Sequence, residues 1–203
     1  MNHLTAAGGW LDLLGLVAAV SSLVFLHFAP TGLSPMRNPV SQYGITPYRA
    51  GYRSATIGLA IAGAGAAVGV AKTLSGRGVG SVVALLVAFA VARAVISWYP
   101  MDAPDRVRTS TGHTHGVIAV VTFAAATLAA LQLGRSLAAP GRWHALSPWS
   151  TGLGLLMAGC VLGMALTRRN EGLRLYFGLV ERGLYVAIIA WLAMLGVALV
   201  HGA

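Results

Sequence analysis

The sequence predicts an all-α fold, a polytopic bundle of six membrane-spanning helices in a single domain, residues 1–203. Of the 203 residues, 57% are hydrophobic and only 9% are charged, whereas soluble domains carry roughly 25% charged residues. A helix needs about 20 mostly apolar residues to cross a bilayer. Six runs meet this length: residues 10–29, 55–74, 80–99, 117–137, 149–167 and 179–200. An even number of spans places both termini on the same side of the membrane.

The charge and the cysteine content exclude several classes of protein. A formal net charge of +9 would suggest a nucleic-acid partner in a soluble protein. Here the arginines lie between apolar runs, where they face headgroups, so we expect membrane lipid as the partner and no nucleic acid. Cys160 is the only cysteine, which excludes an intrachain disulfide and a cysteine metal cluster. Residues 1–9 carry no Lys or Arg, so we expect the first run to be retained as a helix.

Two runs are rich in glycine. They contain Gly58, Gly63, Gly65 and Gly69 in the second run, and Gly152, Gly154, Gly159 and Gly163 in the fifth. Small residues let helix backbones approach closely in lipid. We therefore expect both helices to pack tightly against neighbours, and a substrate passage is the alternative. The abundance of Ala, Gly, Val and Arg, with almost no Lys, is typical of a GC-rich bacterial genome and predicts a bacterial cell membrane.

The connector between the first two runs, residues 30–54, differs from an ordinary linker. Pro35, Pro39 and Pro47 follow Pro30 and exclude a long helix. The segment Ser41, Gln42, Tyr43 suits a short helix or re-entrant turn over the mouth of the bundle. The longer connectors all fall at this same end, and this side holds eight Lys and Arg residues against four on the other. That bias predicts that the end with the long connectors faces the cytoplasm.

Arg93 lies inside the third run, six residues before Tyr99. At 1.5 Å per residue this is roughly 9 Å deep. A charge at such a depth costs about 2.5–3.5 kcal/mol and normally faces a partner inside the bundle. Glu181 and Asp102 are the expected partners. Arg93 then either forms a buried ion pair that joins two helices or holds an anionic headgroup or phosphate.

Four residues at the same end are candidate catalytic groups: Asp102, His113, His115 and Glu181. Asp102 follows Pro100 and either caps a turn or acts as a general acid or base. The two histidines are two residues apart and point about 200° apart on a regular helix. Only one of them can then face the pocket, whereas an unwound first turn would let both bind one ion.

The candidate substrate-binding side chains also converge there: Arg93, Arg168, Arg182, Tyr99, Ser41, Gln42 and Tyr43. His27, His113 and Asp102 together would give a ligand set that suits zinc. The chain has no HExxH or similar close spacing of ligands. A divalent metal is nevertheless a candidate cofactor.

The order of four short motifs resembles the DUF998 family of six-helix membrane proteins. The motifs are Pro39-Val40-Ser41-Gln42-Tyr43-Gly44, Tyr99-Pro100-Met101-Asp102, a histidine (His113 or His115) opening the fourth helix, and Glu181-Arg182. The resemblance covers essentially the whole chain and implies a fold and a site but no reaction. More distantly, the Ser-x-x-Gly loop is similar to that of Frag1/DRAM-type lipid-remodelling proteins. The Ser, Asp and His content is similar to CREST membrane hydrolases, whose paired HxxxH this sequence lacks.

Three functions remain open from the sequence. The first is a membrane-embedded enzyme on a lipid or isoprenoid-like substrate, in which Asp102 and one of the two histidines do acid/base chemistry. The second is a binder or transporter of a lipid or ion that uses the same pocket. The third is a structural subunit, in which the charges only join helices. A homo-oligomer is compatible with each.

Overall fold

The computed structural model describes residues 3–104 and 106–202, and in this part of the chain every regular element is a helix, with no strand. The long helices are α1 (His3–Phe28), α2 (Arg49–Thr73), α3 (Val79–Val95), α4 (Ser110–Ser136), α5 (Leu146–Arg169) and α6 (Phe177–His201). Three short 3-10 helices are η1 (Val40–Ile45), η2 (Ile96–Trp98) and η3 (Glu171–Tyr176). Six helical segments are long and apolar enough to cross a membrane. The predicted six-helix, all-α membrane fold is confirmed.

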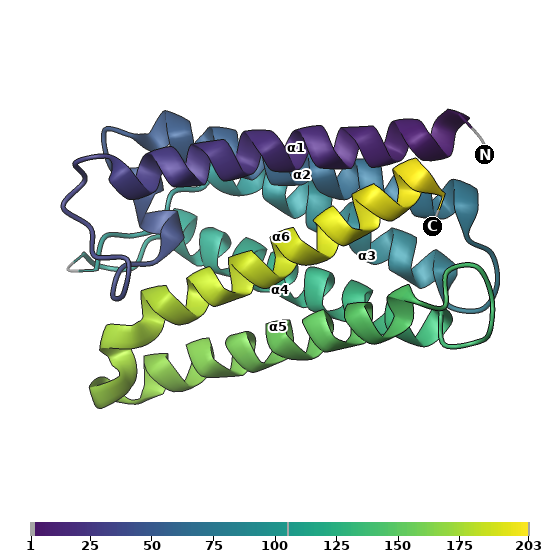
Figure 1. The fold of residues 1–203 in the computed structure, drawn as a ribbon. Coiled ribbons are helices and arrows are strands. Elements are labelled where there is room, and N and C mark those ends of the chain that lie inside the picture. The colour runs from purple at the N-terminus through teal and green to yellow at the C-terminus, as the bar shows by residue number, and fades with distance from the viewer. Residues whose placement is uncertain (1–2, 105, 203) are drawn as a thin grey trace.

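The six helices close into a ring. Each helix packs against the next in the chain, α6 returns to α1, and α6 also contacts α2 and α4. In Figure 1, α6 crosses diagonally between α1 and α5, and the start of α1 and the end of α6 lie at the same end of the bundle. The segments 29–48, 99–104, 106–109 and 170–176 lie at the opposite end, which we call the connector end.

The outward faces of the helices are apolar. Large side chains such as Leu14, Val17, Leu162 and Val186 are 63–65% exposed. A soluble monomer rarely exposes contiguous apolar surface of this kind. The exposed faces are therefore the lipid-facing surface of an integral membrane protein.

Glycine brings α1 and α2 into backbone contact. A Cβ atom added at Gly15 would lie 2.6 Å from the backbone of Gly58 and Ala62. One added at Gly65 would lie 2.5 Å from the amide nitrogen of Asp12. The predicted close packing of the second run, residues 55–74, is confirmed, because only residues without a side chain fit at these contacts.

The fifth run differs from this prediction. A Cβ built at Gly152 or Gly159 would have no atom of the described residues within 4 Å, apart from its chain neighbours and the nearby backbone of α5 itself. Gly154 meets Leu131 of α4, and Gly163 meets Val180 of α6. The expectation of tight packing is therefore wrong for Gly152 and Gly159, which lie on the part of α5 that faces outward.

Candidate functional site

Buried polar side chains gather around Arg93 at the connector end. Arg93 lies in the last turn of α3 and is 1% exposed. Its Nη1 donates a 2.9 Å hydrogen bond to the hydroxyl of Tyr185, and its Cζ lies 5.0 Å from the centroid of the Tyr185 ring. Tyr185 of α6 also packs edge to face on Phe123 of α4, with the ring centroids 6.1 Å apart. Three helices thus meet at one arginine–tyrosine contact.

Several other polar atoms of this cluster have no hydrogen-bond partner within the described residues. Within the described residues, Arg93 Nε and Nη2, the Tyr52 hydroxyl and the Ser97 hydroxyl are buried and have no hydrogen-bond partner. Tyr52 of α2 lies within electrostatic range of Arg93, Tyr185 and Glu181. Buried polar groups without partners are uncommon in native proteins, and each costs about 1–3 kcal/mol. The cluster therefore carries unpaired polar groups at Arg93, Tyr52 and Ser97.

Glu181 does not pair directly with Arg93. Its carboxylate accepts a 2.7 Å hydrogen bond from the backbone amide of Val40, the first residue of η1. Glu181 interacts with Arg182, Arg93 and Arg168 only through longer-range electrostatics. The expected salt bridge from Arg93 to Glu181 or Asp102 is wrong for the part of the chain that the structure describes, since Arg93 bonds to Tyr185 instead. The Glu181 carboxylate accepts from the backbone amide of Val40 instead.

Arg182 holds the connector between α1 and α2 against α6. Its Nη1 donates to the carbonyl oxygens of Pro35 (2.6 Å), Asn38 (2.9 Å) and Gly178 (3.0 Å). Its Nη2 donates to the hydroxyl of Tyr43 at 3.3 Å. A Cβ at Gly178 would lie 2.6 Å from the Pro35 and Asn38 carbonyl oxygens. The guanidinium of Arg182 is therefore engaged in positioning the connector.

The segment Ser41–Tyr43 lies in η1, so the predicted short helix is present. Its side chains mostly contact protein. Gln42 Oε1 accepts from Asn38 Nδ2 at 2.9 Å, and Ser41 Oγ donates to the sulfur of Met101 at 3.2 Å. Tyr43 is 3% exposed. The Ser41 contact joins the connector to the segment that follows α3.

Asp102 organises the turn before α4. Its carboxylate accepts hydrogen bonds from the Thr109 hydroxyl at 2.7 Å and the Thr109 amide at 3.0 Å. Thr109 in turn caps α4 by accepting from the amide of Gly112 at 3.0 Å. The hydrogen bond from the Thr109 hydroxyl is the main cause that lowers the pKa of Asp102 below its ordinary value. Of the two roles predicted for Asp102, this geometry favours the cap.

The two histidines separate as their spacing predicts. His113 is exposed, whereas His115 is buried and its Nδ1 lies 2.7 Å from the carbonyl oxygen of Tyr99. His115 also lies within electrostatic range of Arg93 and Arg168. His115 is therefore the histidine that belongs to the buried cluster.

The proposed metal ligands do not come together. Among the described residues, no group of three or more His, Cys, Asp or Glu side chains is placed to hold a metal ion. His27 is exposed on α1, which packs on α2 and α6, whereas His113 is exposed on α4, which packs on α3 and α5. The Asp102 carboxylate is bound to Thr109. His27, His113 and Asp102 therefore do not form a ligand set in this structure.

Arginine–aromatic contacts occur at the edge of the connector end. The Cζ of Arg168 lies 5.0 Å from the ring centroid of Phe177, and that of Arg53 lies 4.8 Å from the ring of Trp98. Tyr99 is exposed and contributes only its backbone carbonyl, to His115. The sequence did not single out Arg53. Its signal is the spacing of Arg49 and Arg53, one helical turn apart at the start of a span.

Asp12, far from this cluster, received no role from the sequence. It is 0% exposed on α1, and neither carboxylate oxygen has a hydrogen-bond partner within the described residues. The backbone of α2 at Gly65 and that of α6 at Gly196 lie beside it. Its position inside a glycine-rich interface is the signal that could have predicted its burial.

A family model described as a protein of unknown function (DUF998) matches residues 13–198. No curated protein and no solved structure matches the chain. The distant similarity to Frag1/DRAM-type and CREST-type proteins has no support in these comparisons.

Proposed function

The chain belongs to the DUF998 family, whose description assigns no function, and we propose that it binds an anionic lipid inside the bundle. The ligand is a lipid or isoprenoid-like molecule of a bacterial cell membrane, and its phosphate or carboxylate group contacts Arg93. This proposal makes the protein a binder or carrier of the lipid. It needs no covalent step.

The free edge of the Arg93 guanidinium carries the proposal. Nη1 is bonded to Tyr185, which fixes the orientation of the group. Nε and Nη2, which form the opposite edge, have no partner among the described residues. This edge presents two parallel N–H donors, the geometry that matches the oxygens of a carboxylate or phosphate.

The charge balance of the cluster supports the same ligand. Glu181 lies within electrostatic range of three arginines, Arg93, Arg168 and Arg182. A buried arginine costs about 2.5–3.5 kcal/mol at membrane depth. An anion beside Arg93 would offset part of that cost.

Acid/base catalysis on the same lipid is the second candidate. His115 and Glu181 are both buried and lie within electrostatic range of Arg93, so they could exchange protons with a bound group. Asp102 and His113 are less suited, because Asp102 holds Thr109 and His113 is exposed. Loss of a reaction in His115→Ala with lipid binding retained would favour this candidate over simple binding.

Mass spectrometry of co-purified lipid tests the proposal. Removing a charge-assisted bidentate contact costs about 1.5–3 kcal/mol, so Arg93→Gln should lower the affinity for anionic lipid about 10- to 100-fold. Arg93→Lys keeps the charge but loses the two-pronged edge, and we expect it to lose most of the lipid too. Asp12→Asn changes a buried polar group at a distance and is the matched control. Unchanged lipid content in both Arg93 variants, with folded protein by size-exclusion chromatography, would refute the proposal.

A further inference from the structure

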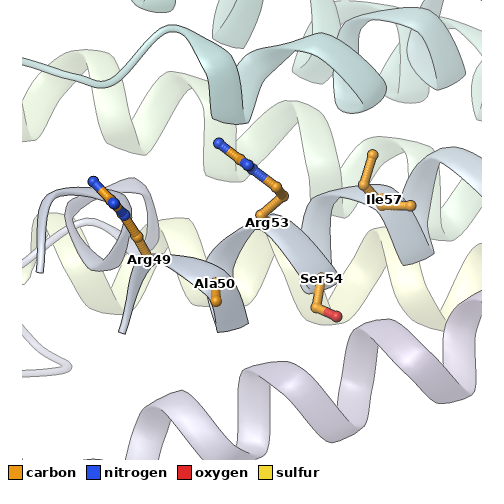
Figure 2. Close-up of a pocket in the computed structure, with 5 residues that line it drawn as sticks. All are labelled: Arg49, Ala50, Arg53, Ser54 and Ile57. Carbon is orange, nitrogen blue, oxygen red and sulfur yellow. The ribbon is translucent and has the colours of Figure 1, made fainter. Parts of the chain in front are cut away.

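A second cationic site lies on the outer face of α2, near its start. Arg49, Ala50, Arg53, Ser54 and Ile57 line a pocket of about 320 Å³. Figure 2 shows that Arg49, Arg53 and Ile57 extend from the same face of the helix. Their spacing of four residues explains this, because residues one turn apart lie above one another.

The two guanidinium groups are free to bind an anion. Arg49 and Arg53 are both exposed, and within the described residues neither side chain forms a hydrogen bond or an ion pair. Like charges one turn apart repel each other. An anion between them would replace this repulsion with two attractive contacts.

Trp98 fixes one wall of the site. The Cζ of Arg53 lies 4.8 Å from the centroid of the Trp98 ring, and Trp98 is 54% exposed at the end of the third span. Tryptophan at a span end marks the level of the lipid headgroups. The stacking holds Arg53 at that level and restricts its motion before any ligand binds.

The pocket changes from cationic to apolar along the helix. Arg49 is the first residue of α2, and Ile57 lies eight residues, or about 12 Å, deeper in the span. Ser54 also lines the pocket, and Figure 2 shows its hydroxyl on the other side of the helix from Arg53. A phospholipid has the same order of groups, a phosphate followed by an acyl chain.

We propose that this pocket binds the phosphate of an anionic phospholipid of the surrounding bilayer. The phosphate lies between Arg49 and Arg53, and the first part of an acyl chain packs on Ile57. The site is separate from the buried cluster and does not depend on it. It adds a bilayer-facing lipid site to the protein.

Native mass spectrometry of the delipidated full-length chain tests the assignment. The chain is titrated with phosphatidylglycerol and, separately, with phosphatidylcholine. Arg49→Gln/Arg53→Gln should weaken phosphatidylglycerol binding about 30-fold at one site. Arg106→Gln/Arg169→Gln removes two exposed arginines from the same end and should change it less than about twofold. Arg49→Lys/Arg53→Lys should retain part of the binding, because it keeps both charges near the headgroups but loses the planar stacking of Arg53 on Trp98.

Three results would overturn the proposal. The first is an equal loss in both glutamine double variants, which would show that only total charge matters. The second is wild-type binding of phosphatidylcholine as strong as that of phosphatidylglycerol. The third is displacement of phosphatidylglycerol by millimolar inorganic phosphate, which would show a site for a soluble anion. The titration is repeated in the Arg93→Gln background, where loss of the buried site would leave this one intact.

Discussion

Tyr52 and Tyr185 offer a direct test of how the buried cluster is held together. Both are buried, and their hydroxyl groups differ: the Tyr185 hydroxyl accepts a 2.9 Å hydrogen bond from Arg93, whereas the Tyr52 hydroxyl has no partner within the described residues. Tyr185→Phe keeps the ring, and with it the contact with Phe123, but leaves Arg93 without its hydrogen bond. A hydrogen bond to a charged group contributes about 1.5–3 kcal/mol. Tyr52→Phe removes an unpaired hydroxyl, so it should be neutral or slightly stabilising.

Thermal unfolding of the detergent-purified protein measures the difference. For a chain of this length, about 2 kcal/mol corresponds to a fall in Tm of about 4–8 °C. We expect that fall for Tyr185→Phe and none for Tyr52→Phe. Equal falls for the two variants would refute the reasoning, because they would show that both hydroxyls contribute alike. If Tyr52 also binds the guest of Arg93, Tyr52→Phe should lose lipid while its Tm stays unchanged.

Three further predictions concern the ends of the bundle and its interior. The hydrogen bonds from Thr109 lower the pKa of Asp102 in the folded chain. The stabilisation that Asp102 gives is therefore fully present above its unfolded pKa of 3.8, and it is lost as the pH falls through the lower folded pKa. Asp102→Asn should therefore remove part of the acid sensitivity of Tm below about pH 4 and leave the pH 5–8 range flat, whereas an altered profile at neutral pH would contradict this. Gly178→Ala places a methyl group against two connector carbonyls and should raise the rate of limited proteolysis within residues 30–48, with Gly159→Ala as the control that faces open space. Asp12→Asn should keep or raise the Tm, since an unpaired buried carboxylate is costly, and a fall of several degrees would reveal a partner that Asp12 needs.

The helices were predictable because hydropathy measures the part of a helix that lies in lipid. Their ends were not. The first run was expected from residue 10 but α1 begins at His3, and the second from residue 55 but α2 begins at Arg49. In both cases the extra turns carry glycine, arginine or other residues that lower hydropathy, yet Gly8 packs on α2 and Arg49 lies at the interface. Hydropathy therefore underestimates the length of helices that continue beyond the apolar layer.

The convergence of polar residues at the connector end followed from topology, since alternate spans bring their ends together. Their partners did not follow. Whether Arg93 meets Tyr185 or Glu181 depends on the rotation of α3 and α6 about their axes, and helices that are apolar nearly all round give no periodic signal for that rotation. The Val40 amide that binds Glu181 and the carbonyls that bind Arg182 are backbone groups. Backbone amides and carbonyls occur in almost every residue type, so the sequence does not show which side chains bind to them.

The Arg182 contacts also have a consequence for biosynthesis. Arg182, Glu181 and Tyr185 all belong to the last helix, yet they bind the connector after the first helix, the start of η1 and the arginine of the third. Chains are made from the N-terminus, so five spans are in place before these partners exist. During that interval the connector carbonyls have no Arg182 guanidinium to accept from, and Arg93 has no Tyr185 hydroxyl to donate to. The connector end is therefore assembled last, and a truncation within α6 should leave five inserted helices with an unformed site.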